Sequence, residues 1–168
     1  MKKIKLTQGF TAVVDDEDYE RVVAAGPWHV EIKQRGAGNE RRYGAHGDRR
    51  EGKVIITLLH RFILGVTKPS VLVDHVDYDG LNCQRYNMRL ASNLQNTRHQ
   101  RKRKDNTSGC KGVHWNKDTQ KWMVRIAVNG IRKYLGLFSS LKKAMQVYDD
   151  AAIKYHGVFS ATNASLQL

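Results

Sequence analysis

The run VLVDHVDYDGLNCQRYNMRLASNLQN, residues 71–96, decides what fold and chemistry are expected of this chain. It begins with three apolar residues typical of a buried strand, which lead into Asp74 and His75. A polar segment rich in Asp and Asn follows, and such residues favour turns because their side chains bond nearby backbone amides. The spacing from Ser92 to Gln95 is typical of a helix N-terminus, so Asn96 is expected about one turn inside a short helix.

The polar side chains of this run suit a metal ion beside a general base, as metal-dependent phosphodiester hydrolysis requires. Asp74 offers a carboxylate and Asn96 a neutral oxygen, which hard divalent ions prefer. His75 has an ordinary pKa close to neutrality, so it can accept a proton from water. Because strand neighbours point to opposite faces, the strand must end or twist at Asp74 and His75. Asp77 and Asp79 are expected to cap backbone amides of the loop.

Positive charge is concentrated in the C-terminal part of the chain. Residues 97–168 carry 14 Lys and Arg against 4 Asp and Glu, a net charge of +10, whereas residues 1–96 carry 15 against 12. Such an excess attracts a polyanion, so nucleic acid is the expected partner. The densest run, residues 98–104, lacks the large apolar residues of a membrane-surface helix but is also compatible with a solvated linker.

Composition excludes several other classes of protein. A hydrophobic content of 40% supports folded cores, and no stretch approaches the ~18 apolar residues of a membrane span. The N-terminus lacks the apolar segment of a signal peptide, so a cytoplasmic location is expected. Cys83 and Cys110 are too few and too far apart for a disulfide framework or a thiolate zinc site.

Hydrophobic periodicity predicts an α+β protein. The periodicity predicts strands over residues 9–14, 28–32 and 54–59, a short helix capped by residues 15–18, a helical turn over residues 60–64, and a loop or long hairpin over residues 34–53. We expect a first domain over residues 1–99, in which residues 69–99 form a strand, a loop and a helix. Residues 100–109 are expected to be a basic linker.

Residues 110–168 are expected to form a second domain. Trp122 begins a strand whose apolar residues alternate, and Asn129-Gly130 is a strong signal for a hairpin into a strand over residues 131–138. Ser139 or Ser140 can cap an amphipathic helix that Gly157 ends. This order predicts a three-stranded antiparallel sheet with one face covered by the helix and the other free for a ligand.

Residues 71–99 resemble the HNH, or ββα-metal, motif of phage and intron-encoded homing endonucleases. The matching positions are Asp74-His75, Asn87 in Tyr-Asn-Met-Arg-Leu, and Asn96 in Leu-Gln-Asn, where the family's third letter is often His. The resemblance implies a site-specific DNA endonuclease with His75 as general base. It implies one Mg²⁺ or Mn²⁺ ion held by Asp74 and Asn96, with Asn87 tying the loop together, and 5′-phosphate and 3′-hydroxyl products.

Residues 111–163 resemble the AP2/ERF DNA-binding domain through Lys111-Gly-Val-His114, Lys121-Trp122, Tyr134-Leu-Gly-Leu-Phe138 and the helix that follows. The pairing of HNH with AP2 recurs in homing endonucleases, and the AP2 sheet lies in the DNA major groove. The family usually has other residues at Lys111, His114 and Arg125, so no sequence preference is inherited. The expected DNA contacts are Arg98, Arg101, Lys102, Arg103, Lys104, Lys111, His114, Arg125, Arg132 and Tyr134.

Three functions remain open. The first is a homing-type endonuclease that acts on double-stranded DNA as a monomer without an organic cofactor, cutting one strand or both. The others are a DNA-binding regulator with a degenerate HNH unit and a basic RNA-binding or ribosome-associated protein. His60 is either a fourth participant in the site or a hydrogen-bonded packing residue. His99 is expected to contact a phosphate or to be exposed.

Overall fold

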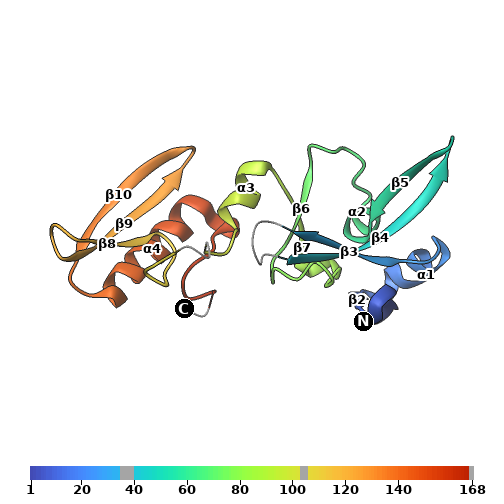
Figure 1. Ribbon diagram of the computed structural model, residues 1–168, viewed down its shortest axis with the longest axis horizontal. Coiled ribbons are helices and arrows are strands. Elements are labelled where there is room, and N and C mark those ends of the chain that lie inside the picture. Colours follow the sequence, from blue (N-terminus) through green and yellow to red (C-terminus); the bar gives the residue numbers. More distant parts are fainter. Residues whose placement is uncertain (35–39, 103–105, 167–168) are drawn as a thin grey trace. The chain divides into compact units, whose positions relative to one another are not determined.

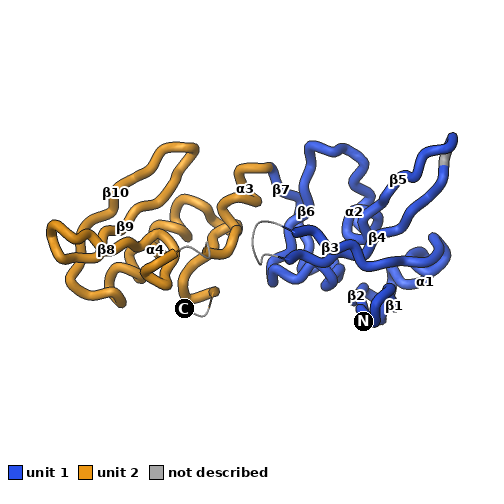
Figure 2. Tube along the Cα trace, viewed as in Figure 1, with its two compact units in different colours: residues 1–92 blue, residues 93–168 orange. Residues whose placement is uncertain are grey.

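The computed structural model describes residues 1–34, 40–102 and 106–166, and its mixture of helices and small antiparallel sheets confirms the α+β class. The chain divides into two compact units, residues 1–92 and residues 93–168 (Figure 2). This division lies before the linker expected at residues 100–109, because helix α3 (Asn93–Arg98) belongs to the second unit. No helix of the described residues is long and apolar enough to span a membrane.

The first unit opens with an antiparallel hairpin and a helix. Its elements are β1 (Lys2–Lys5), η1 (Thr7–Gly9), β2 (Thr11–Val14) and α1 (Asp16–Ala24). Asp15 occupies the N-cap position of α1, yet its side chain makes no capping bond. The expected cap is therefore wrong at Asp15, because its carboxylate instead accepts hydrogen bonds from Gln84 Nε2 at 3.0 Å and Arg85 N at 2.7 Å.

A three-stranded antiparallel sheet follows, in the order β3-β4-β5. Its elements are β3 (His29–Gln34), β4 (Glu40–Arg50) and β5 (Lys53–Leu58), and the chain then enters α2 (Leu59–Leu64) (Figure 1). The segment predicted as a loop or long hairpin therefore supplies β4 and the turn into β5. Gly65 ends α2 with a left-handed backbone (φ 65°), which glycine adopts without steric cost.

The run of residues 71–96 contains a hairpin of β6 (Leu72–His75) and β7 (Met88–Ala91), with η2 (Arg85–Asn87) before the second strand. β6 ends at His75, as the sequence requires. The residue pattern predicted a strand, a loop and a helix and missed β7, because four residues are too short to show a period of two. β7 forms by pairing with β6, with Asp74 opposite Arg89 and His75 opposite Met88.

The loop between β6 and β7 packs against the N-terminal hairpin. Val13 N donates to Leu81 O, and Cys83 N donates to Val13 O, each at 2.8 Å. Arg85 donates two hydrogen bonds to the buried Asp18 of α1, both at 2.8 Å. Cys83 and Met88 also enter the hydrophobic core formed by the hairpin, α1, β3 and α2. Residues before the motif therefore fix the shape of its loop.

The second unit contains the predicted sheet, in the order β10-β9-β8. Its elements after α3 are β8 (Val113–Asn116), β9 (Lys121–Val128), β10 (Ile131–Phe138), α4 (Leu141–His156) and η3 (Gly157–Phe159). Asn129 and Gly130 both have positive φ (51° and 82°), which suits the predicted tight hairpin turn. Ser140 caps α4 by accepting from Lys143 N at 3.4 Å, so the predicted helix start is confirmed.

The face of this sheet that packs on α4 is the one the sequence predicted. Val124 and Ile126 are buried in the second core with Ala144 and Tyr148, and Trp122 packs against this core. Gly112 is required where the chain enters β8, because a Cβ there would lie 2.0 Å from the Tyr148 ring.

Candidate active site

His75, the last residue of β6, lies in a buried cluster of three rings. Its ring centroid is 5.1 Å from that of His60 on α2, with the two planes at 86°, and 6.2 Å from that of Tyr43 on β4. Tyr43 and His60 also contact each other edge to face at 5.3 Å. Only 7% of His75 and 5% of His60 is exposed. Three separate elements therefore hold the His75 ring.

Both histidines keep a buried ring nitrogen without a hydrogen-bond partner among the described residues, Nε2 of His75 and Nδ1 of His60. Such atoms are rare in folded proteins because each forfeits its hydrogen bond to water. Burial lowers the pKa of His75, against the opposing effect of Asp77 and Asp74. Burial and the neighbouring His75 lower the pKa of His60 to about 3. Both rings are therefore neutral at pH 7, and a neutral imidazole nitrogen can accept a proton.

Asp74 makes a different set of contacts from its neighbour His75. Its carboxylate Oδ2 lies 2.8 Å from Arg89 Nε and 2.7 Å from Arg89 Nη2, across the β6–β7 pair. The Asp74 side chain is 8% exposed and that of Arg89 is 19% exposed, so the ion pair is largely shielded from water. The contacts with Arg89 hold the Asp74 side chain in a fixed position.

Asn87 connects the two ends of the loop. Its side-chain Nδ2 donates to Asp77 Oδ1 at 2.9 Å and to Asn82 O at 2.8 Å, while its Oδ1 accepts from Asp77 N at 3.0 Å. Its backbone O accepts from Val76 N at 2.9 Å. The Asn87 side chain is 2% exposed, so its amide is committed to the loop.

Asp77 and Asp79 cap backbone amides of the loop as predicted, and Asn82 joins them. Asp77 Oδ1 accepts from Asp79 N at 2.8 Å, and Asp79 Oδ1 accepts from Leu81 N at 2.9 Å. Asn82 Nδ2 donates to Asp77 Oδ2 at 2.7 Å. At Gly80, a Cβ would lie 2.3 Å from Arg42 O and 2.7 Å from the Tyr43 ring, so the loop lies directly against β4.

Asn96 lies on α3 of the second unit, and the positions of the two units relative to one another are not determined. Within the described residues, no three His, Cys, Asp or Glu side chains gather as a metal-binding group. Within the first unit, Asp74 offers a carboxylate, the type of oxygen ligand that a hard ion such as Mg²⁺ prefers.

The free face of the second unit's sheet carries four of the expected DNA contacts. Pairing places His114 opposite Met123, Tyr134 opposite Arg125, and Arg132 opposite Ala127. Directly paired residues share a face, and alternate residues of β9 share that face too. His114, Arg125, Arg132 and Tyr134 are all exposed, so they form one polar, basic surface.

Of the other expected DNA contacts, three form hydrogen bonds within the protein. Lys111 is partly buried, its Nζ donates to Arg98 O and Gln100 O, and burial lowers its pKa to about 8. Lys111 thereby holds the segment after α3. A DNA contact would require its side chain to face outward, and it does not. Arg98 donates to Asn129 Oδ1 at 2.7 Å and Lys102 to Gly109 O at 2.7 Å. Arg101 is exposed, and Arg103 and Lys104 lie outside the described residues.

Sequence reasoning missed Arg89 and Tyr43 as residues of the site. Arg89 had no assigned role, although its position in a strand paired with β6 places it opposite Asp74. Tyr43 lies in a segment without clear periodicity. The alternative of a hydrogen-bonded packing role for His60 does not account for its unpartnered Nδ1. His99 is 5% exposed, so the expectation that it could be exposed is wrong.

Comparisons with known proteins give two relatives. A protein of Acanthamoeba polyphaga mimivirus named as an uncharacterized HNH endonuclease is 31% identical over 110 residues, covering 62% of this chain and 56% of that protein. Protein 3.8 of Escherichia phage T7 is 36% identical over 58 residues, covering 34% of this chain and 48% of that protein. No family model and no solved structure matches. The chain spans about half the length of these curated relatives, one of which is named as an HNH endonuclease.

Proposed function

We propose that this chain is a metal-dependent DNA endonuclease of the HNH type. The observation that carries the proposal is the buried His75 at the end of β6, with an unpartnered Nε2 and a fixed carboxylate on the preceding residue. The name of the mimivirus relative supports the same class of activity.

His75 is the general base. In its neutral form Nε2 takes a proton from the water that attacks phosphorus, and burial keeps the ring neutral at physiological pH. His60 and Tyr43 hold the ring in place, and Asn87 holds the loop that follows it. This arrangement leaves the proton-accepting nitrogen uncommitted to any internal partner within the described structure.

Asp74 and Asn96 would hold one Mg²⁺ or Mn²⁺ ion. When bound, such an ion would stabilise the charge that develops on the leaving 3′ oxygen, so no protein acid would be needed there. The products then carry 5′-phosphate and 3′-hydroxyl ends. Arg89 contacts the Asp74 carboxylate and holds it in position.

Target selection falls to the second unit, which we propose to be AP2-like and of the homing-endonuclease type. The exposed face with His114, Arg125, Arg132 and Tyr134 suits the major groove of double-stranded DNA, where Arg reads guanine and phosphates are close. With one HNH site in the chain, a monomer acting as a strand-specific nickase is the proposed form.

The test uses supercoiled plasmids that carry a random-sequence library, incubated with the full chain and Mg²⁺ and with mapping of the cut ends. Wild type is expected to give relaxed circles with ligatable 5′-phosphate ends. His75→Ala is expected to lose at least a hundredfold in rate, as for a general base. His46→Gln is the matched control, because His46 binds Pro27 O outside the cluster.

Three outcomes decide between the candidate functions. Equal cleavage by wild type and His75→Ala would remove His75 as the base. Tight duplex binding without cleavage in any divalent ion would favour a DNA-binding regulator. Preference for structured RNA would favour the RNA-binding alternative.

A further inference from the structure

Lys33 and Arg41 lie on the sheet face that carries the ring cluster. In the β3–β4 pair, Glu31 is opposite Tyr43 and Lys33 is opposite Arg41. Directly paired residues and alternate residues of one strand share a face. Arg41 therefore projects from the same side of β4 as Tyr43, two positions away, and Tyr43 contacts both His60 and His75.

Two consecutive arginines of β4 differ in how their charge is balanced. Arg42 Nε lies 2.5 Å from Glu40 Oε1, and its guanidinium lies over the Phe10 ring at 4.7 Å. Arg41 is partly buried and forms no ion pair or hydrogen bond with a carboxylate of the described chain. A partly buried guanidinium has lost hydration and gains from a bound anion.

The residue opposite Arg41 adds a second positive charge. Like charges directly opposite in an antiparallel pair destabilise it. Lys33 Nζ lies 3.5 Å from Glu31 Oε1, but its side chain is 49% exposed, and pairs of this kind contribute little. Lys33 and Arg41 therefore form a pair of cations on the same sheet face as Tyr43, whose ring contacts those of His60 and His75.

We propose that Arg41 and Lys33 form a phosphate-binding subsite for the backbone of the DNA substrate next to His75. The proposal rests on the proposed function and assigns a substrate contact to the first 66 residues of the chain. The Arg41 guanidinium offers paired N–H donors that match a phosphate, while Lys33 contributes a point charge. The subsite places a phosphodiester of the cut strand beside the base, separately from the sheet of the second unit.

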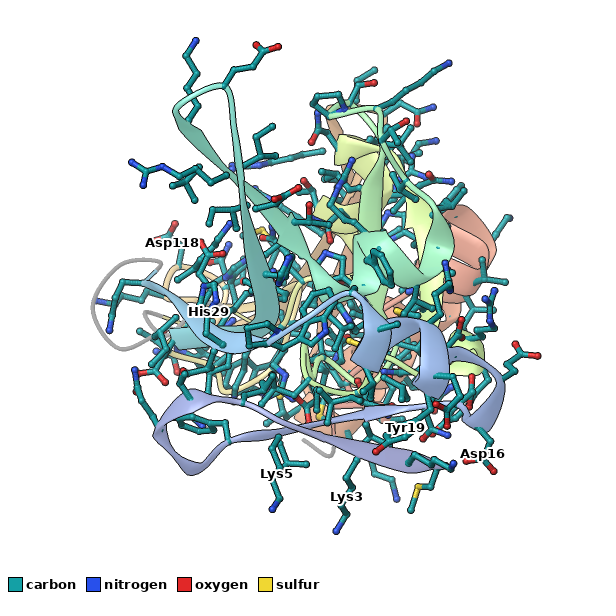
Figure 3. All side chains as sticks on the ribbon, turned by 90° about the vertical axis from the view of Figure 1, so that its right-hand side faces the viewer. Lys3, Lys5, Asp16, Tyr19, His29 and Asp118 are labelled. Atoms are coloured by element: carbon teal, nitrogen blue, oxygen red, sulfur yellow. The ribbon has the colours of Figure 1, made fainter. Side chains whose placement is uncertain are left out.

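The test measures duplex affinity of the full chain in a His75→Ala background, where binding does not depend on turnover. Arg41→Gln is compared with Arg42→Gln, which removes the same charge from the same strand on the opposite face. A second control removes Lys3 and Lys5, whose side chains point away from the unit at the edge of β1 (Figure 3). Arg41→Lys keeps the charge without the planar donors.

Arg41→Gln is expected to weaken duplex binding about tenfold and to reduce the slope of log affinity against log salt by about 0.9, as for one lost phosphate contact. Arg42→Gln and the Lys3/Lys5 variant should leave the affinity within about twofold of that of the His75→Ala parent. Replacing one phosphate near the cut site by an uncharged methylphosphonate should weaken duplex binding by the His75→Ala parent. It should not weaken binding further once Arg41 has been replaced by Gln.

An unchanged affinity and salt slope in Arg41→Gln, with native circular dichroism, would overturn the subsite. Equal losses in Arg41→Gln and Arg42→Gln would also overturn it, because they would show a non-local charge effect. A loss confined to RNA would reject DNA as the occupant. Failure of the proposed function is distinguished by the cleavage assay with His75→Ala, which does not involve Arg41.

Discussion

Arg89 Nε and Nη2 both approach the same oxygen of Asp74, Oδ2, at 2.8 and 2.7 Å. A cation beside a carboxylate stabilises its charge and at the same time opposes binding of a second cation there. Arg89 is therefore a counter-charge that the proposed metal ion would have to displace or share.

Removing this counter-charge should strengthen metal binding. Arg89→Met is expected to raise the affinity of the DNA-free protein for Mn²⁺ about tenfold, which corresponds to about 1.4 kcal/mol, and isothermal calorimetry measures it. Arg89→Lys keeps the charge and is expected to remain close to wild type. If Asp74→Asn binds Mn²⁺ as tightly as wild type, Asp74 is not a ligand.

His60 should make the first unit sensitive to acid. Its pKa is about 3 in the folded chain and near 6.5 when unfolded, so between these values only the unfolded chain binds the proton. The free energy of unfolding should then fall as pH falls from 6.5 to about 3, by up to about 1.4 kcal/mol per pH unit. His60→Phe should flatten this dependence.

The measurement follows Trp28 fluorescence in urea at several pH values, with Trp115 and Trp122 replaced by Phe. Trp28 lies in the core of the first unit, and the other two tryptophans lie in the second unit. Identical pH dependence in wild type and His60→Phe would show that His60 does not titrate as described.

A methyl group at Gly80 should damage the site more than the fold. Gly80→Ala places a Cβ against Arg42 O and the Tyr43 ring, so the loop must move away from β4 and the ring cluster shifts. We expect at least a tenfold loss of kcat, because small misplacements of catalytic groups are costly. Gly47→Ala is the control, since its Cβ would meet only ordinary contacts, the nearest at 3.4 Å from Val54. An equal kcat for Gly80→Ala and Gly47→Ala would contradict the link between the position of the loop and the ring cluster.

Asp15 should stabilise the first unit through the loop. Asp15→Ala leaves Arg85 N and Gln84 Nε2 without their acceptor and is expected to lower the free energy of unfolding by about 1–3 kcal/mol. Asp16→Ala removes a solvent-exposed pair with the N-terminal amine at 2.9 Å and should lower the free energy of unfolding less than Asp15→Ala does. Urea denaturation compares the two, and similar losses would contradict the assigned role of Asp15.

The sequence predicted elements whose signals are local. The Asn129-Gly130 turn, the Ser140 cap and the alternation along β9 each depend on a few neighbouring residues, and all three are confirmed. Interactions between distant segments were not predictable in this way. The capping signal at Asp15 was overridden by a backbone amide 70 residues away, and the Arg89 contact depends on a strand too short to show periodicity.

The residues of the candidate site also divide into those that a local motif predicts and those that depend on contacts between distant segments. Resemblance supplied Asp74, His75, Asn87 and Asn96, because they lie in one short motif. It did not supply Tyr43 or Arg41, which reach the site only through the pairing of β3 with β4. The partial burial of Lys111 depends on the backbone of residues 98–100 and has no local signature.

The backbone hydrogen bonds from Val13 to Leu81 and Cys83 have a consequence for which part of the chain can fold as a unit. The backbone of Val13 pairs with residues 81–83, so the hairpin of β1 and β2 supplies an edge on which the motif's loop is held. A fragment containing the motif alone would lack that template, so it should not fold by itself. A minimal folded unit should therefore include β1 and β2, although the residues that identify the motif all lie after them.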